Sequence, residues 1–517
     1  MQPEAASVRQ RSLSGWRAVE RLFDAAFGSG LNPLRHLGAI GVLALFLLVA
    51  SGAILYILLD TSVGGAHGSI DALAAHPLGR LLRGMHRYAA DALVVALGLH
   101  LLRELLAGHE RGFRRFSWLT GVPLVGFVFV AAIGGFWLNW DELGQYSATA
   151  TAAWIDALPL LATPLSRNFL VAEAVNDRLF SLFVFVHIGA TLLLVFGLWF
   201  HVQRIARARV LPPRHLSLGL AGTLGALALA WPIASHSPAT LATVPAQLRL
   251  DWILLFVHPL TDATSPGITW ALVGGGFLAL FALPFLPQPP RARVAVVDPA
   301  NCNGCQRCFA DCPYAAITMV PHPNQRIGRL LARVDPELCA GCGICAGACP
   351  SSTPFRRVAQ LVTGIDMPQS TIDGLRGRLR RAISASTAQR PLVVFGCEHG
   401  ASTAGTSTSE VAAFDLLCAG QLPPSFIEYA LRDGAAGVLV APCRDCGCEF
   451  RLGERWTIDR LLGRREPRLR AGVDAGRLAL VSAGKGDEPM ITAALAALRR
   501  RVQSMPAPIP ESPRHHA

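Results

Sequence analysis

Four histidines in apolar stretches are the residues of this 517-residue chain best suited to chemistry. His86 and His100 lie fourteen residues apart in one apolar segment, and His187 and His201 repeat that spacing in another. Fourteen residues of α-helix rise about 21 Å and return the side chain to within about 40° of the same face. Two such helices side by side can hold two haems between paired histidines, one above the other. Buried histidines satisfied by neighbouring groups would explain one such residue, but they are a poor explanation for four at duplicate spacing.

Glycines and arginines support the haem interpretation. Two other apolar segments repeat the fourteen-residue spacing, with the pairs Gly38 and Gly52, and Gly121 and Gly135. A porphyrin needs helix surface free of side chains beside its ligands, and glycine provides it; glycine pairs are also common where membrane helices pack. Arg83 and Arg103 each lie three residues from a histidine, where they can pair with haem propionates. Interfacial anchoring is the alternative role for these arginines.

The composition indicates a membrane protein, with 52% hydrophobic and 16% charged residues and apolar runs that end near residue 286. We expect an interfacial amphipathic helix at 14–28 and six spans, near 37–59, 87–107, 118–138, 180–201, 216–234 and 267–286. Arginines crowd the N-terminus and the 102–117 and 202–216 loops, so the positive-inside rule places both termini in the cytoplasm. His100 and His201 then lie near the cytoplasmic face, and His86 and His187 near the outer face. The net charge of +12 indicates contact with anionic lipid and not with nucleic acid, because the arginines flank apolar spans.

Residues 14–210 resemble the N-terminal, haem-bearing half of cytochrome b from bc-type complexes. The matching residues are Gly38, Gly52, Arg83, His86, His100, Arg103, Gly121, Gly135, His187 and His201. The resemblance implies two b-type haems, an outer one on His86 and His187 and an inner one on His100 and His201, and a quinone partner. The family's outer quinone motif, Pro-Glu-Trp-Tyr, is replaced here by Leu-Asp-Trp-Ile at 250–253. Asp251 is the candidate for proton exchange with a quinone; an interfacial Asp-Trp pair is the equally good alternative.

All thirteen cysteines follow residue 301, which favours metal clusters on a reducing, cytoplasmic side over disulfides. Eight of them form two runs of the pattern Cys-x2-Cys-x2-Cys-x3-Cys-Pro, which is that of bacterial two-cluster ferredoxins, where the fourth cysteine of each run ligates the other cluster. One [4Fe–4S] cluster then takes Cys302, Cys305, Cys308 and Cys349, and the other takes Cys339, Cys342, Cys345 and Cys312. Zinc is the weaker alternative, since its sites prefer two separated Cys-x-x-Cys knuckles. The short link at 286–293 predicts that these clusters lie beside the inner haem.

The remaining cysteines lie in a tail that alternates strand and helix patterns, which predicts an α/β domain with a parallel sheet. Strands expected at 391–397, 413–418 and 436–443 each end in a cysteine, at the edge where such sheets place their sites. Residues 391–485 resemble the iron–sulfur delta subunit of methyl-viologen-reducing hydrogenase. That resemblance implies a [2Fe–2S] cluster on Cys397, Cys418, Cys443 and Cys448, with Cys446 as an additional candidate. A zinc site or a redox-active thiol pair at 443–446 is the alternative.

The sequence therefore predicts a multidomain protein. We expect a cytoplasmic segment at 1–35, a membrane domain at 36–290 (an all-α four-helix haem bundle plus two further spans), a small α+β two-cluster domain at 291–356, a linker at 357–388, an α/β iron–sulfur domain at 389–501 and a disordered tail at 502–517. The expected function is electron transfer, coupled to the membrane potential, between the quinone pool and a soluble cytoplasmic partner at the cell inner membrane. That partner would be a hydrogenase, a formate dehydrogenase or a heterodisulfide-reductase-like flavoprotein. A membrane platform for such an enzyme is the main alternative, a redox sensor is a third, and a homodimer is left open.

Overall fold

The computed structural model describes residues 8–159, 162–170, 174–203, 208–242, 248–287, 293–323, 330–353, 360–444 and 447–506. Cys446 and the residues after 506 therefore lie outside the described part of the chain. The chain divides into two compact units, an N-terminal one that reaches Gln288 and a C-terminal one that starts at Pro289. Each unit is described by itself.

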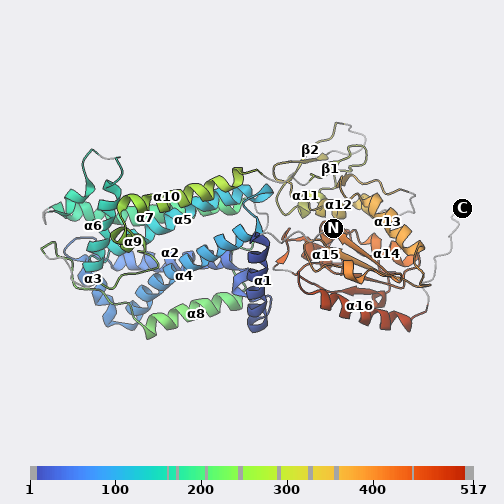
Figure 1. Cartoon of the computed structure of the whole chain (residues 1–517), viewed down its shortest axis with the longest axis horizontal. Coiled ribbons are helices and arrows are strands. Elements are labelled where there is room, and N and C mark those ends of the chain that lie inside the picture. Colours follow the sequence, from blue (N-terminus) through green and yellow to red (C-terminus); the bar gives the residue numbers. More distant parts are fainter. Residues whose placement is uncertain are drawn as a thin grey trace. The chain divides into compact units, whose positions relative to one another are not determined.

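Long helices make up the N-terminal unit (Figure 1). Its centre is built from α2 (Leu37–Leu58), α4 (Pro77–Ala107), α5 (Arg115–Trp137) and α7 (Asp177–Gln203). Helix α2 packs along α4, and α5 packs along α7. Two further helices lie against this bundle, α8 (Arg214–Ala230) beside α4 and α10 (Pro266–Ala282) beside α5. A helix is thus present at each of the six expected spans.

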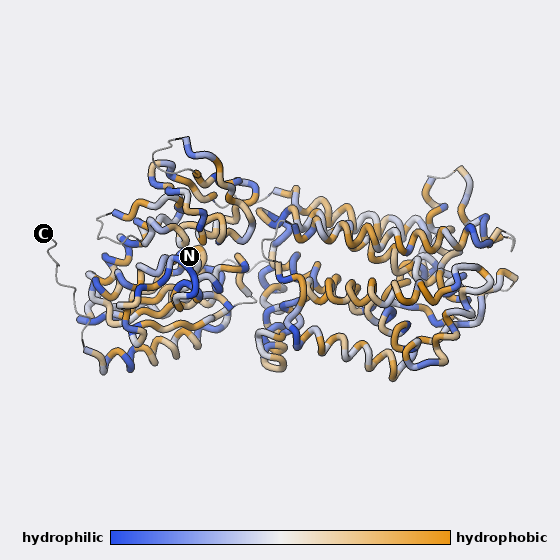
Figure 2. Tube along the Cα trace, turned by 180° about the vertical axis from the view of Figure 1, so that it is seen from behind, coloured by the Kyte–Doolittle hydropathy of each residue, from blue (hydrophilic) through white to orange (hydrophobic). Residues whose placement is uncertain are grey.

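Four helical segments in the described part of the chain are long and apolar enough to cross a membrane: Leu37–Leu58, Gly112–Trp137, Asp177–Gln203 and Pro266–Phe285. Figure 2 shows these long helices as largely hydrophobic along their length. Helix α4 carries several charged residues and α8 has only 17 residues, so neither is among the four. The count of six spans stays a prediction.

Helix α4 is longer than its apolar run. It begins at Pro77, ten residues before the expected span, because proline fits the first helical turn and the preceding His76 is extended. It ends at Gly108, whose φ of 85° is the left-handed conformation that commonly terminates a helix. The polar N-terminal turns of α4 gave no apolar signal, so the sequence missed them.

Shorter helices lie at the two ends of the bundle (Figure 1). The amphipathic helix expected at 14–28 is α1 (Val8–Phe27), which packs at one end against α4. Helix α6 (Glu142–Asp156) lies at the other end, where α3 (Ala66–Ala72) is also found. Helix α9 (Val257–Ala263) packs on α6 and α10. The sequence predicted α1 but not α3, α6 or α9, because their mixed polar and apolar residues give no long apolar run.

The first part of the C-terminal unit is small and carries the two runs of cysteines. It has short helices α11 (Arg307–Asp311) and α12 (Ile344–Ala348) and two antiparallel strand pairs. The pairs are β1 (Val296–Val297) with β4 (Ile365–Asp366), and β2 (Ile317–Pro321) with β3 (Leu330–Val334). Each short helix lies between the second and fourth cysteines of one run.

The second part contains a parallel sheet, as the sequence predicted, and its four strands lie in the order β6-β5-β7-β8. Its strands are β5 (Leu392–Cys397), β6 (Val411–Leu416), β7 (Gly437–Val440) and β8 (Leu478–Leu480), and its helices are α13 (Ile372–Ser384), α14 (Ser425–Arg432), α15 (Gly453–Leu461) and α16 (Glu488–Gln503). Side chains of β5 alternate between two cores. Val393 and Phe395 enter the core formed with α13 and α14, whereas Leu392 and Val394 enter the one formed with α16.

Helix α13 corrects the expectation of a linker at 357–388. Its Ile372, Leu375 and Leu379 are fully buried in the core of the sheet domain. The arginines between these positions give the stretch its polar composition, yet a leucine or isoleucine every three or four residues forms one apolar face. This part of the expected linker therefore belongs to the folded domain.

Candidate functional site: histidine pairs and cysteine sets

The four histidines of the bundle each face a glycine on the neighbouring helix. A Cβ atom at Gly52 would lie 2.9 Å from Cε1 of His86, and one at Gly38 would lie 3.4 Å from Cε1 of His100. On the other helix pair, the corresponding separations are 3.1 Å from Gly135 to His187 and 2.9 Å from Gly121 to His201. Real Cβ contacts are rarely this short, so the glycines make room for the imidazole rings themselves.

A layer of apolar side chains lies halfway between two levels of histidines. One level is formed by His86 and His187, and the other by His100 and His201. On each of the four helices, one residue of this layer stands midway between the two glycines or the two histidines that are fourteen residues apart. These residues are Leu45, Leu93, Val128 and Leu194. All four are buried and belong to one cluster. Because the midpoints of the four helices meet, the two histidine levels are in register on α4 and α7.

His86 and His187 form a pair whose geometry fits a shared iron. Their ring centroids are 6.2 Å apart. Two metal–nitrogen bonds of about 2 Å each, plus about 1 Å from each nitrogen to its ring centre, give about 6 Å. Nδ1 of His187 lies 2.7 Å from the Ala131 carbonyl oxygen, and Nδ1 of His86 lies 3.1 Å from that of Leu48. Hydrogen bonds at Nδ1 fix the ring and leave Nε2 for a metal, so these residues fit a bis-histidine haem.

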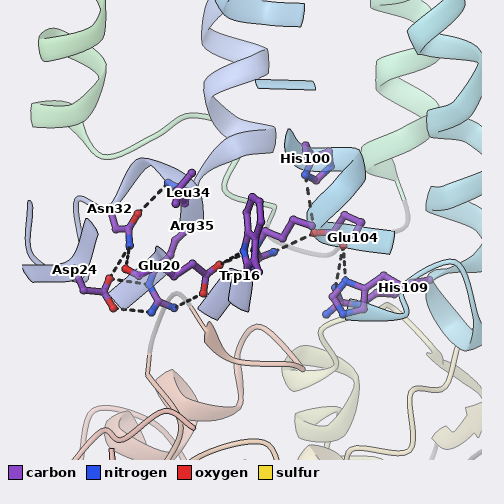
Figure 3. A network of polar contacts seen from close by, with 11 residues as sticks. Trp16, Glu20, Asp24, Asn32, Leu34, Arg35, His100, Glu104 and His109 are labelled. Atoms are coloured by element: carbon purple, nitrogen blue, oxygen red, sulfur yellow. Dashed lines mark hydrogen bonds and ion pairs between the residues drawn. The ribbon is translucent and has the colours of Figure 1, made fainter. Parts of the chain in front are cut away.

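The second pair has different polar neighbours. Nδ1 of His201 lies 3.4 Å from the Thr120 hydroxyl. Nδ1 of His100 lies 3.9 Å from a carboxylate oxygen of Glu104, as Figure 3 shows. A carboxylate near Nδ1 is a common outer partner of a metal-bound histidine. This pair therefore differs from the first in charge as well as in position.

The two arginines expected at haem propionates have different environments. Arg83 donates from Nη2 to the Ser235 hydroxyl at 2.9 Å, while its buried Nη1 has no hydrogen-bond partner in the described part of the chain. A propionate would satisfy that donor. Arg103 is engaged by carboxylates, with Nε 3.2 Å from Glu20 and Nη1 3.0 Å from Glu104. Arg83 thus fits the expected role better than Arg103 does.

Polar contacts tie α1 to this end of the bundle (Figure 3). Trp16 fixes the buried Glu20 within α1 by donating to it at 2.8 Å, and Asp24 of α1 pairs with Arg35 at 2.7 Å. At the start of α1, Arg9 pairs with Glu110 at 2.9 Å. Burial raises the pKa of Glu110, but the Arg9 hydrogen bond and neighbouring positive charge outweigh it, so the pKa of this carboxyl lies below its usual range. The sequence predicted an amphipathic helix here but not this network.

Asp251, the candidate for proton exchange, is held by several donors. Its carboxylate forms an ion pair with Arg87 and accepts the backbone N–H groups of Ile253 and Leu254 at 3.0 and 2.6 Å. The adjacent Trp252 is 71% exposed, as expected for an interfacial aromatic residue. A proton can reach Asp251 only at the expense of these contacts.

The eight cysteines of the two runs line two separate cavities. One is lined by Cys302, Cys305, Cys308 and Cys349, and the other by Cys312, Cys339, Cys342 and Cys345. Each cavity thus combines three cysteines of one run with the last cysteine of the other. Burial raises the pKa of the Cys308 thiol to about 12 and raises that of Cys342 as well. These two thiols are therefore protonated at neutral pH, and their binding as thiolates requires the positive charge of a metal.

The tail brings four more cysteines together at the carboxyl edge of the sheet. Cys397 ends β5, while Cys418 and Cys443 follow β6 and β7. Together with Cys448 they form a closed ring, in which each thiol hydrogen-bonds to two others. Four thiols at contact distance suit a metal site with four sulfur ligands.

Sequence reasoning missed an arginine beside these cysteines. Arg460 of α15 is fully buried and pairs with Asp311, which precedes Cys312. Burial lowers the pKa of Arg460, and Asp311 opposes that effect. The partners are 149 residues apart in sequence, so no local pattern reveals the pair; an aspartate next to a ligand cysteine is the one signal available.

A bundle with paired histidines, followed by two cysteine-lined cavities, defines a membrane electron-transfer protein. Three family models match the chain in succession: cytochrome b/b6 at residues 23–207, the 4Fe-4S dicluster domain at 301–353, and the delta subunit of methyl-viologen-reducing hydrogenase at 393–505. The three resemblances expected from the sequence are thus confirmed, in the same order. The first implies haem and the second implies [4Fe–4S] clusters. Among solved structures, a chain described as "Hyperthermophilic respiratory Complex III" is 17% identical, with 54% of this chain and 83% of that chain covered and a TM-score of 0.39.

Proposed function

We propose that this protein transfers electrons between a soluble cytoplasmic redox enzyme and the quinone pool of the cell inner membrane. In this proposal both termini and the cysteine-bearing unit face the cytoplasm. The partner is a hydrogenase, a formate dehydrogenase or a heterodisulfide-reductase-like flavoprotein, in keeping with the match of the tail to a hydrogenase delta subunit.

The assignment of cofactors follows the grouping of the side chains. His86 and His187 would hold one b haem, and His100 and His201 the other. The two cysteine-lined cavities would hold one [4Fe–4S] cluster each, and the ring formed by Cys397, Cys418, Cys443 and Cys448 a [2Fe–2S] cluster. Bound there, these groups supply one-electron transfer, while the protein sets their spacing and environment.

The observation that carries the proposal is the register of the bundle. The shared midpoint layer keeps two histidine pairs at two depths, so the protein can carry charge across part of the membrane. Moving one charge through 100 mV is worth about 2.3 kcal/mol, which would allow the membrane potential to assist electron flow to a low-potential acceptor. We assign proton exchange at the outer end to Asp251. Before it can take up a proton, its carboxylate must separate from Arg87.

Membranes that contain the protein provide the test, through haem absorbance after reduction. Added quinone should oxidise the haems of the wild type, and His201→Leu should abolish electron flow to the cytoplasmic enzyme while leaving that enzyme bound. His215→Leu, at an exposed histidine of α8, is the matched control and should behave as wild type. Absence of quinone-dependent haem oxidation in the wild type would refute the proposal. Full activity in His201→Leu would instead support a role as a membrane platform.

A further inference from the structure

Arg460 contacts three separate segments of the C-terminal unit: the end of α11, the start of α12 and the short 3-10 helix Ala419–Gln421. Its side chain has no exposed surface and its guanidinium group makes three kinds of contact. Nη2 lies 2.5 Å from a carboxylate oxygen of Asp311 and 3.3 Å from the backbone oxygen of Ile344, and Nη1 lies 2.8 Å from the backbone oxygen of Gly420. A planar fork of donors is suited to joining several acceptors at once. One side chain therefore links three segments that are far apart in sequence.

Two of these segments lead into the cavity lined by Cys312, Cys339, Cys342 and Cys345. Asp311 immediately precedes Cys312, and Ile344 immediately precedes Cys345. The position of Asp311 is fixed a second time by Arg465, whose Nε lies 2.8 Å from its other carboxylate oxygen. Arg460 thus contacts the chain directly beside two of the proposed ligands.

The third segment directly follows Cys418, which belongs to the ring of four cysteines in the tail. The Gly420 peptide lies between Arg460 and Cys418, since its oxygen accepts from Arg460 and its N–H lies 3.4 Å from the Cys418 sulfur. The helix that carries Arg460 also begins against this sulfur, because a Cβ atom at Gly453 would lie 2.1 Å from it. Gly347 has no room for a side chain either, with the Gly420 oxygen 2.3 Å from its Cβ position. The two cysteine sites are therefore in tight contact through Arg460.

Arg460 also retains an unused donor. Its buried Nε has no hydrogen-bond partner in the described part of the chain. A buried donor without an acceptor is costly, and the sulfurs of a bound cluster accept hydrogen bonds that tune its potential. The side chain thus fits a site that binds an anionic sulfur cluster.

We propose that Arg460 is a positioning residue for electron transfer between the ring of tail cysteines and the cavity lined by Cys312, Cys339, Cys342 and Cys345. It fixes the separation of the two sites, and its charge raises the reduction potential at the ring. The inference rests on the proposed electron-transfer function. The step moves one electron, oxidising one site and reducing the other, with no bond formed or broken.

The test compares three variants of the full-length protein in detergent. Arg460→Met removes the charge and the donors, and Asp311 keeps Arg465 as its partner. Arg460→Lys keeps the charge but loses the fork, so it reaches fewer of the acceptors. Arg455→Met changes an arginine on the same helix whose side chain is 55% exposed, and it serves as the control.

The readouts are the midpoint potential of the tail cluster, from a redox titration followed by electron paramagnetic resonance, and the rate of electron transfer between the two sites, from rapid freeze-quench. Arg460→Met should lower the potential, because loss of a positive charge disfavours the reduced cluster, and should slow transfer about 10- to 100-fold. Arg460→Lys should slow electron transfer but keep the potential near that of wild type. If Arg460→Met does not retain iron, the transfer rate of Arg460→Lys tests the proposal instead. The control should match wild type in both.

Transfer at the wild-type rate in Arg460→Lys, or a wild-type potential in iron-replete Arg460→Met, would overturn the proposal. So would a lower unfolding temperature with unchanged potential and rate, since that is the result of a purely structural role. These measurements use chemical reductants and no quinone. They can therefore succeed even if the haems prove not to react with quinone, which separates this inference from the proposed function.

Discussion

Replacing the glycines that face the histidines should remove one haem at a time. The Cβ of Gly52→Ala would lie 2.9 Å from Cε1 of His86, where ordinary contacts begin at 3.4 Å. The ring must move by at least the difference, and overpacking of this kind costs about 1–3 kcal/mol. That cost lowers the affinity for a haem on His86 and His187 by about 5- to 150-fold.

The free energy of unfolding of the haem-free bundle should increase or stay the same in this variant, although its haem affinity falls. Alanine is more favourable than glycine in a helix by about 1 kcal/mol, and without haem the His86 ring is not held by a metal, so it can turn away from the added methyl group. We therefore expect Gly52→Ala to lose haem while its unfolding temperature without haem is maintained. Gly121→Ala, whose Cβ meets His201 at 2.9 Å, should affect the other haem.

Haem content and the potentials of the two haems, measured by absorbance during a redox titration, provide the assay. Each variant should lose one of two potentials, and the potential lost should differ between them. Gly189→Ala in α7 is the matched control, because nothing lies within 4 Å of its Cβ position. If Gly52→Ala and Gly121→Ala each bind two haems as tightly as this control, the assigned histidine pairs are wrong.

Three further predictions concern other parts of the chain. Cys349→Ser should expose Cys305 to alkylation, detected by mass spectrometry, and leave the thiols of the other cavity protected; protection of Cys305 would contradict the grouping in the structure. Gly453→Ala should lower the iron content by the share of the tail site alone, because its Cβ would overlap the Cys418 sulfur, and an unchanged iron content counts against that site. The Arg9–Glu110 pair holds the pKa of Glu110 low, so its stabilisation is present above the usual pKa of glutamate, about 4.3, and is lost as the pH falls through the lower pKa of the folded protein. Unfolding temperatures of wild type and Arg9→Met should therefore converge in acid, and an equal difference at all pH values would show that the pair does not titrate.

Chemistry that repeats at fixed spacing could be predicted from the sequence. The histidines and glycines had to recur every fourteen residues to share a helical face, and the strand-ending Cys397, Cys418 and Cys443 had to meet at one edge of a parallel sheet. These patterns are local and periodic, so each segment carries its own signal. The structure places the glycines against the imidazole rings, a more specific position than beside a porphyrin.

Features that depend on distant contacts could not be predicted. Helix α13 has a polar composition, and the apolar face formed by Ile372, Leu375 and Leu379 does not by itself reveal that it packs into the core of the sheet domain. Arg460 and Asp311 carry no motif and meet across 149 residues. The contact of Asp251 with Arg87 likewise joins α4 to a loop that lies far along the chain. In each case the role of the residue depends on a partner that is distant in sequence.

The shared midpoint layer also restricts how this chain can change in length during evolution. One residue inserted between His86 and His100 would turn one histidine by about 100° and shift it by about 1.5 Å relative to the other. Leu93 would then lose its place beside Leu45, Val128 and Leu194. Insertions and deletions should therefore be confined to the segments between helices, while relatives that bind the same haems should keep all four intervals unchanged. A change in the fourteen-residue interval of one helix would therefore require the same change in the other three.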